Sequence, residues 1–140
     1  MDKKVLITKK YEFSASHRYW NKDWDQKKNE QVFGKCTSPH GHGHNYDLHV
    51  TISGKIDPAT GMIINLTDLK RMVKVVLEDF DHKYLNLDTP FFKDQIPTTE
   101  NIARVLFDRV DKELTGKGDF DLQRIRLYER NDLYVDVWRN

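Results

Sequence analysis

The chain has 140 residues, and its 23 Lys and Arg residues nearly balance 22 Asp and Glu residues, for a formal net charge of +1. This length indicates one domain, residues 1–140, and the balanced charge argues against a dedicated nucleic-acid-binding protein. No apolar run is long enough to span a membrane, and the first residues do not form a secretory leader. Because a lone cysteine, Cys36, cannot form an internal disulfide, we expect a cytoplasmic protein that binds neither nucleic acid nor membranes.

Two strands separated by a long irregular segment are predicted in the first part of the chain. Residues 5–17 alternate between apolar and polar side chains, which is typical of a strand. Residues 18–37 show no clean period and predict a loop with room for one helical turn. A structureless segment of this length is often functional. Residues 42–52 alternate again and predict a second strand, with His42 and His44 on one face.

Two helices and a hairpin are predicted in the rest of the chain. Apolar residues repeat at intervals of three and four over residues 65–80 and 98–114, and each segment opens on a residue that can cap a helix. Residues 122–130 and 133–138 predict two strands, joined by Asn131-Asp132, which tolerate the left-handed conformation that a tight turn needs. This order of elements favours an α+β fold, an antiparallel sheet with the helices on one face.

Histidines carry the strongest functional signal. Side chains two residues apart on a strand point to the same side, so His42 and His44 lie together. His17 ends the preceding strand, and pairing of the two strands would bring three imidazoles to one end of the sheet. Three nitrogen ligands with an open fourth position are typical of catalytic zinc, although scattered histidines are more often surface or core residues. His40 precedes the regular strand and His49 has the opposite parity, so we predict neither as a ligand.

Cys36 and the pair Asp81-His82 are weaker candidates. Cys36 stands six residues before His42, close enough to lie beside a metal as a base or nucleophile, or to be an incidental thiol. Asp81 could orient His82 as an acid–base pair. Adjacent residues on a helix do not face each other, however, so the spacing alone favours a structural role for both.

Glu129 has the same parity as Ile125 and Leu127, and we expect it to face inward. A buried carboxylate needs a partner. Either a ligand with adjacent N–H donors, such as the guanidine-like edge of a heterocycle, or one of the neighbouring residues Arg126 and Arg130 could be that partner.

These residues fall within an ordered series of motifs that runs along nearly the whole chain. The motifs are Phe13–Arg18, Phe33–Cys36, Gly41–Tyr46, Asp57–Met62, Asp81–Lys83, Thr98–Asn101 and Tyr128–Glu129. With this series the chain resembles the 6-pyruvoyl-tetrahydropterin synthase family, which includes the 6-carboxy-tetrahydropterin synthases of queuosine biosynthesis. The resemblance implies a tunnelling fold, in which a four-stranded antiparallel sheet carries two helices on one face. Three subunits would then close a barrel, and two barrels would stack as a homo-hexamer, a dimer of trimers.

The resemblance also implies a role for each candidate residue. His17, His42 and His44 would hold one Zn²⁺ per subunit, and Cys36 would be the base that abstracts a proton. Asp81 and His82 would relay protons, from a neighbouring subunit. Glu129 would anchor the pterin ring through its 2-amino and N3 positions, and Thr98 and Thr99 would add hydrogen bonds to the ring.

The implied substrate is 7,8-dihydroneopterin triphosphate, whose triphosphate leaves with Mg²⁺ to give 6-pyruvoyl-tetrahydropterin. Five residues separate Cys36 from His42, as in the pyruvoyl-forming branch of the family. Three residues separate Cys36 from His40, as in the queuosine branch, which forms 6-carboxy-tetrahydropterin and acetaldehyde. We expect the pyruvoyl-forming activity. The carboxy-forming activity and a non-catalytic pterin-binding module are the alternatives.

Overall fold

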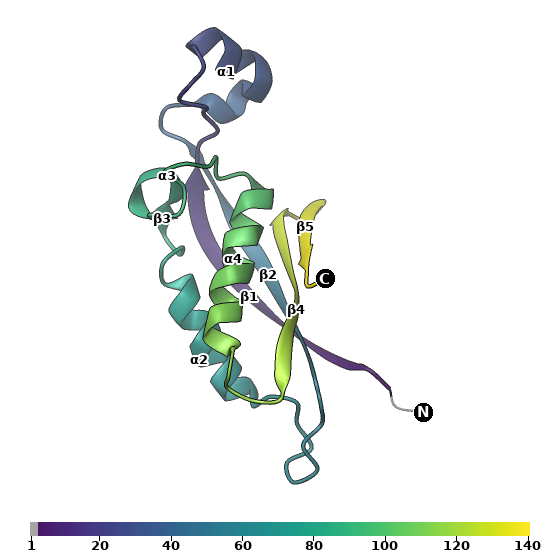
Figure 1. The fold of residues 1–140 in the computed structure, drawn as a ribbon. Coiled ribbons are helices and arrows are strands. Elements are labelled where there is room, and N and C mark those ends of the chain that lie inside the picture. Colours follow the sequence, from purple (N-terminus) through teal and green to yellow (C-terminus); the bar gives the residue numbers. More distant parts are fainter. Residues whose placement is uncertain (1–2) are drawn as a thin grey trace.

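The computed structural model describes residues 3–140, so the first two residues of the predicted domain lie outside it. One sheet with strand order β3-β1-β2-β4-β5 forms the centre of the fold, and helices cover one of its faces (Figure 1). The strands are β1 (Val5–His17), β2 (His42–Gly54), β3 (Lys83–Tyr84), β4 (Phe120–Arg130) and β5 (Leu133–Trp138). The helices are α1 (Gln26–Phe33), α2 (Leu66–Leu77), α3 (Leu85–Asp88) and α4 (Thr99–Leu114). The predicted α+β class is confirmed.

β1 and β2 form a long antiparallel pair whose register decides where the histidines lie. Val5 pairs with Gly54 at one end, and His17 pairs with His42 at the other. Phe13 and Ala15 are buried on the face of β1 that the helices cover. The same face carries His17, because side chains of equal parity lie on the same side of a strand. The hydrophobic pattern of β1 therefore brings His17 to the inner face beside β2.

α2 and α4 pack side by side on the inner face of the sheet and close the core (Figure 1). Asn65 caps α2 by accepting a hydrogen bond from the Thr67 N–H (2.9 Å), as its sequence position predicts. α2 ends at Leu77, before the predicted end at residue 80. Phe80 is nevertheless fully buried, because the turn after α2 keeps it on the apolar stripe. Among residues 3–140, no helix is long and apolar enough to cross a membrane.

The sheet is five-stranded and mixed, which corrects the expected four-stranded antiparallel sheet. The additional strand, β3, has only two residues and pairs in parallel with Ala15 and Ser16 of β1. Two residues are too few to show the alternation that identifies a strand in sequence. The four longer strands are antiparallel to their neighbours, as expected.

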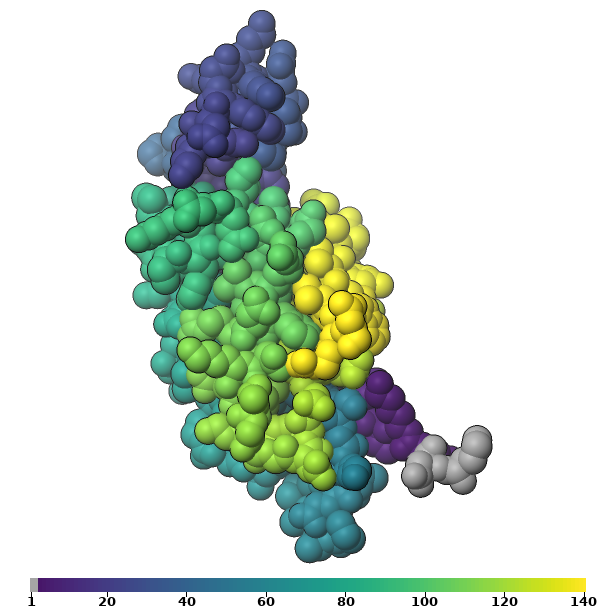
Figure 2. All heavy atoms as spheres, viewed as in Figure 1, coloured from purple at the N-terminus to yellow at the C-terminus, as the bar shows by residue number. Residues whose placement is uncertain are grey.

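The segment predicted as a loop over residues 18–37 contains α1 and a 3₁₀ turn, Gly34–Thr37. Asp25 caps α1 by accepting a hydrogen bond from the Lys28 N–H (2.8 Å). The only buried residue of α1 is Asn29, so the helix has no apolar stripe to reveal it in sequence. Figure 2 shows that this segment projects from the body of the molecule, at the end opposite the N-terminal strand.

The turn between β4 and β5 also differs from the prediction. Among residues 3–140, His82 is the only non-glycine residue with a positive φ, so neither Asn131 nor Asp132 is left-handed. Instead, the register shifts between Tyr128 and Arg130, and Glu129 is an extra residue without a partner on β5. A bulge of this kind changes the direction of a side chain and is common next to functional sites.

Gly41, which precedes β2, has φ 70°, and a Cβ at this position would lie 2.8 Å from the His17 carbonyl oxygen. Gly61 has a similar φ of 74° but open space around it. We expect Gly61→Ala to lose about 1–2 kcal/mol of unfolding free energy from the left-handed backbone alone. Gly41→Ala should lose clearly more, because the methyl group must displace the end of β1. Urea unfolding of both variants measures the difference, and equal losses would contradict the contact with His17.

Candidate metal and active site

Three imidazoles converge at the end of the sheet where β1 finishes and β2 begins. One ring nitrogen each of His17, His42 and His44 lies within 4.8 Å of the other two. The His17 and His42 Nε2 atoms are 3.2 Å apart. The predicted convergence is confirmed. The two other histidines of this region stay out of the group, as predicted: His40 is exposed, and His49 packs beside the Tyr128 ring on the opposite face.

A hydrogen bond to the chain fixes the ring of His17, which is completely buried. Its Nδ1 lies 2.7 Å from the carbonyl oxygen of Pro97, just before α4. A carbonyl oxygen can only accept, so Nδ1 carries the proton and Nε2 is left with a free lone pair. This arrangement is typical of histidines that bind metals, whose second nitrogen is usually held by a carbonyl or carboxylate.

Burial of the cluster favours the uncharged form of two of its imidazoles, those of His17 and His44. Burial lowers the pKa of His17 to about 4, and the neighbouring His42 and His44 contribute to the decrease. Burial also lowers the pKa of His44. Desolvation disfavours the charged form of an imidazole. The rings of His17 and His44 therefore present neutral nitrogen atoms at pH 7, as a metal ion requires.

The donor set fits a divalent zinc ion. His44 Nε2 is buried and has no hydrogen-bond partner, so its lone pair faces the cluster unused. Three imidazole nitrogens with a position left open are the ligands of many catalytic zinc sites. Within residues 3–140, Cys36 does not belong to the group of possible ligands.

Glu129 closes one side of the cluster. Its Oε1 lies 3.5 Å from both His17 Nε2 and His44 Nε2, and it accepts a hydrogen bond from the Thr99 hydroxyl (3.0 Å). The two arginines considered as partners bind other carboxylates. Arg126 donates to Asp136 (2.7 Å), and Arg130 pairs with Asp132 (3.4 Å). The inward orientation predicted for Glu129 is thus observed.

Cys36 lies in the 3₁₀ turn after α1 and is half-buried. The Tyr19 N–H donates to the Cys36 carbonyl oxygen (2.8 Å), which ties this turn to the end of β1. Burial raises the pKa of the Cys36 thiol, and the Glu129 carboxylate raises it further. The thiol is therefore close enough to Glu129 for the charge of this carboxylate to affect the pKa of the thiol.

The two threonines at the start of α4 differ in their contacts. Thr98 caps the helix by accepting a hydrogen bond from the Asn101 N–H (3.2 Å). Thr99 is buried and directs its hydroxyl to Glu129. Thr98 thus fixes the start of the helix, and Thr99 is its contact with the site.

Asp81 and His82 do face each other, contrary to the interpretation from their spacing. Asp81 Oδ1 lies 3.0 Å from His82 Nδ1 and also accepts a hydrogen bond from the Ser14 N–H (2.8 Å). Because α2 has ended and His82 has φ 60°, the rule for neighbours on a helix does not apply. The Ser14 N–H holds the pKa of Asp81 below its usual range, and His82 contributes to the decrease. The His82 side chain is 82% exposed and makes no hydrogen bond to the three histidines within residues 3–140.

Tyr19 belongs to the site, although sequence reasoning did not single it out. Its ring meets the His17 ring edge-on, with 5.1 Å between the ring centres. Burial raises the pKa of Tyr19 to about 12, and Glu129 and Cys36 contribute to the increase. The sequence does contain a signal for Tyr19: it follows His17 by two residues, and side chains two apart on an extended segment point to the same side. The absence of a regular pattern after His17 hid that signal.

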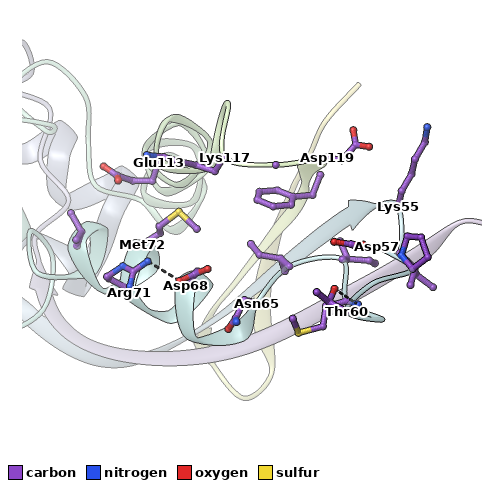
Figure 3. A pocket seen from close by; sticks show the side chains of 18 residues that line it. Lys55, Asp57, Thr60, Asn65, Asp68, Arg71, Met72, Glu113, Lys117 and Asp119 are labelled. Atoms are coloured by element: carbon purple, nitrogen blue, oxygen red, sulfur yellow. Dashed lines mark hydrogen bonds and ion pairs between the residues drawn. The ribbon is translucent and has the colours of Figure 1, made fainter.

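A cavity of about 940 Å³ lies away from the histidines, between the loop after β2, α2 and the start of β4 (Figure 3). The motif Asp57–Met62 forms part of its wall. In this wall Asp68 pairs with Arg71, and Asp57 accepts a hydrogen bond from the Ala59 N–H. The cavity contains none of the predicted site residues, and the motif forms a self-contained turn.

In the metal-free protein, the buried His17 should make stability depend on pH. Its pKa is about 4 in the folded state and about 6.5 in the unfolded state, so the unfolded state binds more protons between these values. We expect the unfolding free energy to fall by roughly 3 kcal/mol as the pH decreases from 6.5 to 4. Urea unfolding with a chelator, for the natural chain and His17→Gln, measures this loss. If the unfolding free energy of His17→Gln depended on pH as steeply as that of the natural chain, groups other than His17 would be responsible for the effect.

Comparison with known proteins places this site in a family. The family model of 6-pyruvoyl tetrahydropterin synthase matches residues 6–140. The 6-pyruvoyl tetrahydrobiopterin synthase of Pongo abelii is 43% identical over 130 residues, which cover 92% of this chain and 88% of that protein. A protein of Archaeoglobus fulgidus named putative 6-carboxy-5,6,7,8-tetrahydropterin synthase is 33% identical, covering 99% of this chain and 100% of its own. The solved 6-pyruvoyl tetrahydropterin synthase of Caenorhabditis elegans superposes with a TM-score of 0.92 at 30% identity, over 99% of this chain and 97% of that one. The fold, the site and these similarities together show that the chain belongs to the 6-pyruvoyl tetrahydropterin synthase family.

Proposed function

We propose that this protein is a zinc-dependent lyase that converts 7,8-dihydroneopterin triphosphate to 6-pyruvoyl-tetrahydropterin with elimination of triphosphate. The observation that carries the proposal is the group of three converging histidine nitrogens, with the Glu129 carboxylate against it and the Cys36 thiol nearby. The names of the relatives support the reaction class.

The zinc ion would be held by His17, His42 and His44, each of which has a ring nitrogen within 4.8 Å of the other two. When bound, it supplies Lewis acidity that polarises the hydroxyl groups of the substrate side chain and makes the adjacent C–H more acidic. The chain's own contribution is to hold the His17 ring neutral and in one tautomer, through burial and the Pro97 carbonyl.

Glu129 and the start of α4 form the proposed pterin-binding part of the site. A carboxylate can accept two N–H groups at once, which matches the 2-amino and N3 edge of a pterin. The Thr99 hydroxyl already holds Oε1, so the carboxylate has one orientation before the ring binds. Thr98, the helix cap, would contribute a further hydrogen bond to the ring.

Cys36 and the pair Asp81-His82 are the proposed proton-transfer groups. The Cys36 thiolate would remove the proton from the side-chain carbon. Asp81 orients the imidazole of His82, which returns the proton elsewhere on the substrate. Unsaturation thereby moves from the ring to the side chain and triphosphate leaves, with Mg²⁺ accompanying it, so no external redox cofactor is required.

The exposed position of His82 supports a site completed by another subunit. The outer edge of β5 is unpaired within residues 3–140, and so is β1 before its short contact with β3. Free edges on both sides of a sheet allow copies to join strand to strand. We therefore propose that three copies close a barrel and that two barrels stack as a homo-hexamer, in which His82 serves a neighbouring subunit.

Zinc content tests the proposed ligands. We expect the purified protein to bind one zinc ion per chain and His42→Ala to lose it, because two imidazoles hold zinc far more weakly than three. His49→Ala is the matched control, since His49 lies on the same strand but on the other face. Metal analysis after dialysis measures the content. Equal loss in the two variants would show that the face of the strand does not decide metal binding.

Product analysis tests the reaction. Incubation of the zinc-loaded protein with 7,8-dihydroneopterin triphosphate and Mg²⁺, without a reductase, should yield 6-pyruvoyl-tetrahydropterin and triphosphate. Acetaldehyde without a pyruvoyl product would instead establish the carboxy-forming activity.

Cys36→Ala should retain zinc and pterin binding but lose turnover by roughly two to four orders of magnitude, the usual contribution of a general base. If the natural chain bound the pterin but did not convert it, the only remaining interpretation would be a non-catalytic pterin-binding module.

A further inference from the structure

The turn that carries Cys36 is held by two consecutive residues that follow β1. The Tyr19 N–H donates to the Cys36 carbonyl oxygen (2.8 Å). The Arg18 Nε–H donates to the carbonyl oxygen of the next residue, Thr37 (2.9 Å). The Arg18 guanidinium also lies over the Trp20 ring, 4.1 Å from its centre, which fixes the direction of the side chain. The position of the turn therefore depends on where the backbone of residues 18 and 19 lies.

The backbone of Arg18 is itself held by one side chain, the amide of Asn86 in α3. Asn86 Oδ1 accepts a hydrogen bond from the Arg18 N–H (2.8 Å), and Asn86 Nδ2 donates to the Arg18 carbonyl oxygen (2.8 Å). A backbone N–H can only donate and a carbonyl can only accept, so the amide of Asn86 has one orientation. Asn86 thus binds Arg18 through the same two groups that a peptide of a neighbouring strand would use.

The position of Asn86 continues the pairing between β1 and β3. The two strands are parallel, and Ser16 lies opposite Tyr84. Arg18 and Asn86 each follow this pair by two residues, so they stand in the same register. The backbone at Asn86 has already entered α3, which the buried Leu85 anchors to the core, and cannot pair with β1. The side chain therefore supplies the two hydrogen bonds that the backbone of a longer β3 would have made.

We propose that Asn86 and Arg18 are positioning residues for Cys36. The Asn86 amide fixes the backbone after β1, and the Arg18 side chain transmits this position to the turn that carries the thiol. This inference rests on the proposed function, because it deepens the role of Cys36 as the base. A short 3₁₀ turn has poor hydrogen bonds of its own, whereas a group that takes a proton from carbon must be placed closely. Because Asp81-His82 directly precedes β3, one short segment then positions both proposed proton-transfer groups.

Asn86→Leu removes both hydrogen bonds to Arg18 and retains the size of the side chain. We expect kcat with 7,8-dihydroneopterin triphosphate to fall about ten- to hundredfold, the effect of moving a reacting group by up to about 1 Å. KM and zinc content should change less than about twofold, because Asn86 binds Arg18 and neither the histidines nor Glu129. A rise of KM with unchanged kcat, a loss of zinc, or no change at all would overturn the proposal.

Thr89→Val is the matched control for a general loosening of α3. Thr89 directly follows this helix and is buried, and its hydroxyl donates to the Leu85 carbonyl oxygen (2.8 Å), a bond that stays within the segment. We expect this variant to keep kcat within about twofold of the natural chain. Equal losses of kcat in Thr89→Val and Asn86→Leu would assign the effect to α3 as a whole and contradict the role of the Asn86 amide.

Arg18→Met tests the other end of the link. It keeps the backbone bonds to Asn86 but removes the donor to the Thr37 carbonyl oxygen. We expect a lower kcat with unchanged KM, as in Asn86→Leu. The double variant should lose less than the product of the two single losses, because both substitutions act through the same turn. Losses that multiply would show that the two residues act separately and would overturn the link.

Alkylation of Cys36 tests the link without any turnover. Cys36 is the only cysteine of the chain, so iodoacetamide reports on one known thiol. We expect zinc-loaded Asn86→Leu to react about fivefold faster than the natural chain, because the loss of hydrogen bonds makes opening of the turn more frequent. Thr89→Val should react at the natural rate. An unchanged rate in Asn86→Leu would overturn the proposal. If the natural chain lacked turnover but the alkylation rate still rose, the proposed reaction would fail while the link from Asn86 to the Cys36 turn stood.

Discussion

The burial of His17 in neutral form is the constraint on which the site depends. A fully buried imidazole must give its N–H to the protein, and the only proton of this ring goes to the Pro97 carbonyl. The opposite nitrogen then faces outward from the core toward β2, where the strand register places His42 directly across. The backbone before α4 and the pairing of β1 with β2 therefore determine together where three lone pairs meet.

Charge at the site is unbalanced in a way that favours a cation. Glu129 is largely buried against the histidines, and no lysine or arginine pairs with it within residues 3–140. Its hydrogen bond from Thr99 offsets only part of the cost of burial. A divalent ion among the three rings would bind the lone pairs and attract the carboxylate at once. The same carboxylate is then fixed beside the place where a pterin would bind.

The sequence predicts those features that repeat along an element. Alternation over residues 5–17 and 42–52 was sufficient to place the three histidines on one face, and the caps Asn65 and Thr98 located the two long helices. The 3₁₀ turn at Cys36 and the two residues of β3 are too short to show a repeating pattern of apolar residues, so the sequence does not predict them. The contact of Asp81 with His82 depends on a single left-handed residue. Tyr19 lies just beyond the end of a strand, where parity no longer identifies a face.

The bulge at Glu129 has a consequence for the sign of the charge that the histidines meet. The two residues at the end of β4, Glu129 and Arg130, carry opposite charges, and Glu129, which has the parity of Leu127, is the one that turns inward. Shortening β4 by one residue there would reverse the facing of the strand end and present the guanidinium of Arg130 to the rings. The positive charge would then repel a metal ion from the three rings. The proposed binding of a cation thus depends on one residue of chain length as much as on the three histidines themselves.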